Sequence, residues 1–170
     1  MANSLLPYLK CVRTTLQAAF CLRDFPCQQV ERHNRPEVEF QQNPELVSKS
    51  VLICRSSAEK CLIEPSINSV RVSLKIKNAD QMDRFIASMF LRFLMQRAES
   101  FEILRKVPVD GYDISFLICN SHLSAMHSEG VIDFICDFIA TADAQISELK
   151  LRVNARGRAL GSELLQALSA

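Results

Sequence analysis

Glycine and proline are scarce in this chain: 170 residues contain only four glycines and six prolines. The glycines do not cluster, so phosphate-binding loops such as G-x-x-x-x-G-K-[ST] and G-x-G-x-x-G are absent, and so is the nucleophile elbow G-x-S-x-G. The three histidines, His33, His122 and His127, lack the spacing of shared metal ligands. We therefore expect no catalytic centre, no metal and no cofactor, and a protein that is not an enzyme.

Long apolar runs and a strong net charge are also lacking. No run approaches the ~20 residues that a membrane span needs, and Met1–Lys10 has no basic region ahead of an apolar stretch, which argues against a secretory signal. A net charge of +1 gives no support for nucleic-acid binding. The seven cysteines are odd in number and form no C-x-x-C pair, so we expect small buried hydrophobes in a reducing, cytoplasmic compartment.

The residues that are present suit a single domain spanning 1–170. Apolar side chains recur on one helical face between about Asn3 and Arg23. From Pro36 the period changes: apolar and acidic residues alternate over Glu37–Phe40, and short apolar runs follow at Val51–Cys54 and Cys61–Ile63. Val70–Lys77 alternates strictly, which predicts a half-buried strand with one wet, basic face.

A second helix is predicted from Asn78 or Asp80 to about Glu99, with a face of methionine and phenylalanine lying on the sheet. Two strands, Phe101–Val107 and Tyr112–Cys119, should follow around a turn at Pro108–Gly111, the second of them central. With a helix after residue 120, the order is helix, three strands, helix, two strands, helix. This order predicts an α+β fold of two layers, with helices on an antiparallel sheet.

The C-terminal segment, residues 121–168, predicts one long, coiled-coil-like helix. At about 1.5 Å per residue, Val131 to Leu168 spans ~55 Å, whereas a domain of this size has a radius of gyration of only about 15 Å. Its apolar face should therefore continue onto another chain. The residues that we assign to that packing face are Ile135, Phe138, Ala142, Ile146, Leu149, Val153, Leu160 and Leu164.

Charge and glycine leave two questions open on this helix. Residues 121–147 carry four acidic side chains and no lysine or arginine, whereas basic residues dominate from residue 148 onward. Basic residues near a helix C-terminus suit its macrodipole, and on a projecting tip they also suit an acidic protein surface. The alternative to one continuous helix is a break near Gly130 or Gly157, with two shorter helices folded back on one domain.

Several strings, in order from end to end, carry a resemblance to a known family: Val30–Glu39, Leu62–Glu64, Ser66–Ser73, Arg97–Glu99, Pro108–Ile118, Ile146–Leu151 and Val153–Arg158. Together they resemble subunit 4, the twenty-kilodalton subunit, of the actin-related protein 2/3 complex. The mass of 19.2 kDa agrees.

This resemblance implies a non-catalytic, actin-binding scaffold subunit of the cytoplasmic actin cytoskeleton, at the actin-rich cortex and projections. Its partners would be the larger subunit 2, the two actin-related proteins, the other subunits and the mother actin filament during branched nucleation. Arg156 and Arg158 match the family's basic pair near the helix end, a candidate filament contact. The alternative function is a chaperone-like or adaptor module that holds a client with its long helix.

Overall fold

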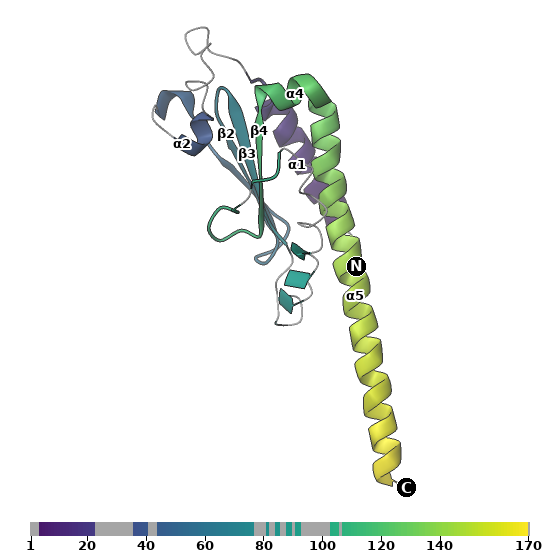
Figure 1. The fold of residues 1–170 in the computed structure, drawn as a ribbon. Coiled ribbons are helices and arrows are strands. Elements are labelled where there is room, and N and C mark those ends of the chain that lie inside the picture. Colours follow the sequence, from purple (N-terminus) through teal and green to yellow (C-terminus); the bar gives the residue numbers. More distant parts are fainter. Residues whose placement is uncertain are drawn as a thin grey trace.

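The computed structural model describes residues 4–22, 36–40, 44–76, 81, 84–85, 88–89, 91–92, 103–105 and 107–169. A four-stranded sheet forms the centre, with α1 (Leu5–Ala19) and α5 (Ser128–Ser169) on one side of it and α2 (Glu37–Phe40) on the other (Figure 1). A short 3-10 turn, Pro44–Leu46, precedes the first strand. The predicted α+β fold with a long C-terminal helix is confirmed.

The sheet is antiparallel throughout, in the order β1-β2-β3-β4. Its strands are β1 (Val51–Cys54), β2 (Lys60–Pro65), β3 (Ser69–Lys75) and β4 (Ile114–Cys119). The predicted strand Phe101–Val107 is reduced, within the described residues, to an isolated bridge between Leu104 and Phe116. The prediction that Tyr112–Cys119 is a central strand is wrong, because β4 is the last strand of this sheet. On its outer side only residues 103–105 bond to it: the Arg105 N–H donates to the Ser115 carbonyl and the Leu117 N–H to the Ile103 carbonyl.

The predicted turn before β4 is present. The Tyr112 N–H donates to the Val109 carbonyl at 3.0 Å, and Gly111 takes a φ of +86°. That backbone conformation strains residues with a Cβ, which accounts for glycine at this position.

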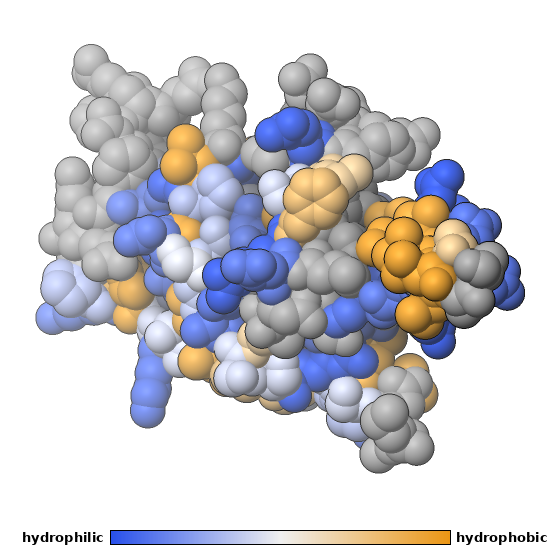
Figure 2. Space-filling view, turned by 90° about the horizontal axis from the view of Figure 1, so that it is seen from below, coloured by the Kyte–Doolittle hydropathy of each residue, from blue (hydrophilic) through white to orange (hydrophobic). Residues whose placement is uncertain are grey.

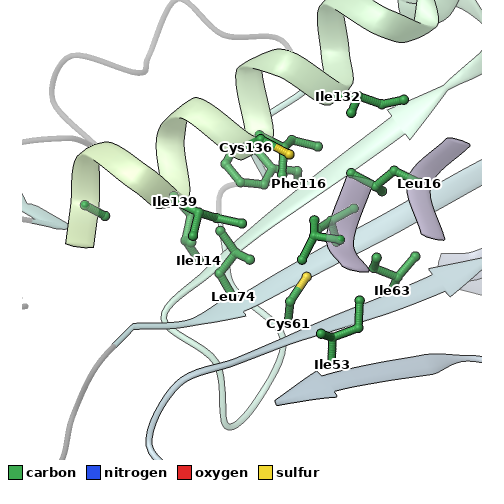
Figure 3. Packing of buried hydrophobic residues seen from close by; sticks show 14 of the residues in the cluster. Leu16, Ile53, Cys61, Ile63, Leu74, Ile114, Phe116, Ile132, Cys136 and Ile139 are labelled. Atoms are coloured by element: carbon green, nitrogen blue, oxygen red, sulfur yellow. The ribbon is translucent and has the colours of Figure 1, made fainter. Parts of the chain in front are cut away.

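The core lies between the sheet and the helices α1 and α5 (Figure 3). Val12 and Leu16 of α1 belong to the same core cluster as Val72 of β3 and Ile135 of α5, and all four are fully buried. Phe116 of β4 packs edge-on against two phenylalanines of α5, with ring centroids 5.9 Å from Phe134 and 5.5 Å from Phe138. Edge-to-face pairs add about 0.5–1.5 kcal/mol each beyond area burial, so they help hold α5 on the sheet.

The other face of the sheet is not the wet, basic face that alternation predicted. Ser73 is fully buried there and hydrogen-bonds Ser115 at 2.8 Å. The Arg71 side chain is only 11% exposed and bonds both Glu64 and Glu39. Alternating apolar and polar residues show that the two faces of a strand differ in polarity. They do not show that another element, here α2, covers the polar face.

Glu37–Phe40, which the alternation indicated as extended, is a helical turn. Two side chains, from the β2–β3 connection and from the start of β3, accept its first free amides: Asn68 Oδ1 from the Glu37 N–H at 3.0 Å and Ser69 Oγ from the Val38 N–H at 3.4 Å. Unsatisfied amides at a helix start need such partners. A four-residue pattern is too short to reveal partners 31 positions away.

The predicted helix from Asn78 or Asp80 to Glu99 falls largely outside the described residues, although those described between 81 and 92 are helical. Leu91 is buried, but Phe85 and Met89 are 66% and 56% exposed. The prediction that both lie on the sheet is therefore wrong.

The C-terminal region is two helices rather than one. α4 (Asn120–Met126) ends at His127, whose φ of 60° breaks the helix before α5 begins at Ser128. At the start of α4 the Cys119 N–H donates to His122 Nδ1 at 2.9 Å, which gives this histidine a capping role. Gly130 and Gly157, near which the alternative placed a break, both lie inside the 42 continuous residues of α5. The observed break at His127 is close to Gly130 in the sequence, but the two helices are not divided at that glycine.

The cysteines are less buried than predicted. Cys61 and Cys136 are buried and Cys119 is intermediate, but Cys11, Cys21 and Cys54 are exposed. All six described cysteines are free thiols. Cys27 lies outside the described residues.

A candidate docking surface on helix α5

The first half of α5 belongs to the chain's own core. Ile135, Ala142 and Ile146 are buried, and Phe138 and Leu149 are partly buried against the same cluster. These five residues of the predicted packing face thus belong to the core cluster that this chain forms with α1 and the sheet. Ile146 is the last buried residue of the helix.

The second half of α5 projects beyond the sheet (Figure 1). Every residue from Leu151 to Leu168 is exposed, a length of about 26 Å at 1.5 Å per residue. The remaining residues of the predicted face lie here: Val153 is 46%, Leu160 61% and Leu164 63% exposed. The predicted face is therefore divided, with its first part covered by the chain and its second part open.

The open part continues the stripe that packs in the core. At about 100° per residue, Leu164 lies at the same angle around the axis as Ile146, and Leu160 lies about 40° from it. We call Val153, Leu160, Leu164 and Leu168 the distal stripe. Figure 2, seen from the end toward which α5 points, shows hydrophobic side chains gathered on the projecting helix with hydrophilic ones beside them.

Leu151 lies outside the distal stripe, although it is also exposed, at 67%. Leu151 and Leu160 are about 180° apart around the axis, because their positions in the helix differ by nine residues at about 100° each. An exposed leucine on the opposite side of the same helix is a natural control for any contact made by the stripe.

The two predicted filament-contact residues, Arg156 and Arg158, are both exposed on the projecting half. Two positions apart on a helix means about 200° around its axis, so they point to nearly opposite sides. Arg156 lies about 40° from Leu160, beside the distal stripe, whereas Arg158 lies about 160° from it. One flat partner surface cannot contact both.

Sequence reasoning missed the polar contact that fixes α5 near its exit from the core. Arg55, in the β1–β2 connection, reaches Asp143 of α5 at 2.6 Å and Glu59 at 3.2 Å. The partners Arg55 and Asp143 are 88 positions apart. Only a fold that lays α5 across the β1–β2 connection brings them together, and no local pattern signals it.

In the described part of the chain, no group of three or more His, Cys, Asp or Glu side chains could hold a metal ion. None of the described helices is long and apolar enough to cross a membrane.

Comparison with known proteins identifies the family. Residues 1–167 match the family described as ARP2/3 complex 20 kDa subunit (ARPC4). The chain belongs to the ARP2/3 complex 20 kDa subunit family. The resemblance found in the sequence strings is thereby confirmed, and the matched range includes nearly all of the projecting half of α5.

Curated relatives of the ARP2/3 complex 20 kDa subunit family are similar along almost their whole length. Actin-related protein 2/3 complex subunit 4 of Dictyostelium discoideum is 51% identical over 166 residues, 98% of each chain. The probable subunit 4 of Caenorhabditis elegans is 49% identical over 166 residues, again 98% of each. Subunit 4 of Saccharomyces cerevisiae is 51% identical over 159 residues, 93% of each.

Proposed function

We propose that this chain is a non-catalytic structural subunit of the actin-related protein 2/3 complex, acting as one domain in the cytoplasmic actin cytoskeleton. The names of its relatives support membership of that complex. The single observation that carries a structural role is the projecting half of α5. Its distal stripe exposes large apolar side chains, from Val153 at 46% to Leu168 at 76%.

The distal stripe is the surface that would join this chain to a partner. An exposed amphipathic helix longer than its own core is stabilised when a second apolar surface covers it. The partner we propose is an amphipathic helix of the larger subunit 2, packed along the stripe. The two actin-related proteins and the other subunits would then assemble around this pair.

The opposite side of the projecting helix would stay accessible after that packing. Arg158 lies there, about 160° from Leu160. A guanidinium on a projecting helix suits carboxylates of an acidic protein surface. We propose that this side contacts the mother actin filament in branched nucleation, with Arg158 as its main charge and Arg156 at the rim of the subunit interface.

A truncation tests this proposal. The chain ending after Lys150 loses the projecting half but keeps every buried residue of α5. Co-expressed with subunit 2, the full chain should co-purify with it one to one, and the truncated chain should not. Circular dichroism would show that the truncated sheet and core still fold.

The full chain purifying as a stable homodimer without subunit 2 would instead favour the chaperone-like function. Undiminished co-purification of the truncated chain would show that the distal stripe is not the contact.

A further inference from the structure

Arg55 joins three separate segments at the point where α5 leaves the core. Its Nε donates to Ser4 Oγ, ahead of α1, at 2.8 Å. Its Nη1 donates to Glu59 of the β1–β2 connection at 3.2 Å and to Asp143 of α5 at 2.6 Å. The β1–β2 connection is itself closed by the Arg55 N–H, which donates to the Glu59 carbonyl at 3.0 Å.

The contact is partly shielded from water. Side-chain exposure is 17% for Arg55, 10% for Glu59 and 19% for Asp143. Burial alone would lower the pKa of the Arg55 guanidinium, but the hydrogen bond to Asp143 and the charge of Glu59 raise it overall. The guanidinium therefore stays charged, and a charge-assisted bond at low exposure is stronger than one on an open surface.

The position of Asp143 gives this contact leverage. It lies three residues before Ile146, the last buried residue, and eight before Leu151, where full exposure begins. The projecting half is about 26 Å long, so a tilt of about 10° at its base would move the tip by about 4.5 Å. That displacement approaches one helical turn of about 5.4 Å, enough to disrupt the interdigitation of side chains between two helices.

We infer that Arg55 is a positioning residue that sets the direction in which α5 leaves the core, and so pre-orients the distal stripe for its partner. The inference rests on the proposed function. Without the contact the helix would still fold, because its core residues are untouched, but the projecting half would sample more directions. In only a fraction of encounters would the projecting half of α5 then point in the direction that allows binding. The association rate would fall to that fraction of its value.

Three variants separate positioning from general stability. Asp143→Asn keeps the shape and removes the charge, and Asp143→Glu keeps the carboxylate. Asp133→Asn is the matched control: Asp133 also bonds an arginine of another element, Arg13, at 2.8 Å, but near the start of α5 and at 58% exposure. The full chain carrying each change is passed over immobilised subunit 2 while association and dissociation are recorded.

The expected result is a split between the two rates. Asp143→Asn should slow association about 3- to 10-fold and change dissociation less than about 2-fold, because the docked helix is held by its partner. Asp143→Glu should restore most of the association rate, and Asp133→Asn should leave both rates at the wild-type values.

Other outcomes overturn the inference in distinguishable ways. The Asp143→Asn chain could associate with subunit 2 at the wild-type rate while its binding still depends on Leu160. That result would refute the positioning role and leave the proposed function standing. An equal effect of Asp133→Asn would show general destabilisation instead. Absence of binding by the wild-type chain would refute the proposed function, and the positioning role with it.

Discussion

Replacing Leu160 with alanine should weaken assembly without weakening the fold. The residue is 61% exposed, so its side chain adds little to the core. Full burial of a leucine is worth about 1.5–3 kcal/mol, and covering the share that is still exposed is then worth about 1–2 kcal/mol. Losing that contact should raise Kd for subunit 2 about 5- to 30-fold. Unfolding free energy should change by no more than about 0.5 kcal/mol.

Leu151→Ala and Ile146→Ala bracket this prediction. Leu151 is similarly exposed but on the opposite side of the helix, so its replacement should leave Kd within about 2-fold. Ile146 lies on the same side of α5 as Leu160, about 40° from it around the axis, but is only 2% exposed. Its truncation leaves a cavity in the core and should cost about 2–5 kcal/mol of stability.

Competition measures these differences even where the free chain is poorly soluble. Equal amounts of wild-type and variant chain compete for limiting tagged subunit 2 during co-expression, and mass spectrometry gives the ratio captured. Stability is followed by denaturant unfolding. Equal loss of capture for Leu160→Ala and Leu151→Ala, or none for either, would refute the division of the helix into a docking side and an open side.

Three further predictions follow from the same structure. Arg158→Glu should reduce filament branching by the assembled complex while leaving assembly intact, whereas Arg156→Glu should impair assembly first. If both variants assembled normally and lost branching equally, this prediction would be contradicted. Ser115→Ala should lower the free energy of unfolding by about 1–3 kcal/mol, more than Ser73→Ala, because Ser115 Oγ also accepts a hydrogen bond from the Val109 N–H. Denaturant titration measures both losses, and a larger loss for Ser73→Ala would count against the bond to Val109. Burial raises the pKa of Cys61 to about 12, so its thiol stays protonated and should resist iodoacetamide at pH 9 until the chain unfolds; mass spectrometry of the native chain should find it unmodified.

Periodicity predicted the parts of this fold whose residues bury one side of a regular element. α1, β3, β4 and α5 all have apolar residues repeating over many positions, and each forms close to where the pattern placed it. The same pattern cannot tell which neighbour covers a face. It therefore treated Ile135 and Leu160 alike, although one is fully buried in the chain and the other is open.

Three features of the structure could not be predicted from the sequence for a different reason. His127 breaks the helix by a single positive φ, and no glycine or proline marks it. Glu37–Phe40 is helical because of amide acceptors 31 positions away. The contact of Arg55 with Asp143 likewise spans 88 positions. Each depends on the assembled fold, whereas the opposed directions of Arg156 and Arg158 follow from helix geometry once α5 is known to be continuous.

Hydrogen exchange on the assembled complex tests the central claim most directly. Amides of residues 131–146 lie in the part of α5 packed on its own core, and amides of 151–168 lie in the part whose side chains are all exposed in this chain. If the distal stripe is covered by a partner, both segments should exchange slowly and to a similar degree. Fast exchange over 151–168 beside slow exchange over 131–146 would contradict the account.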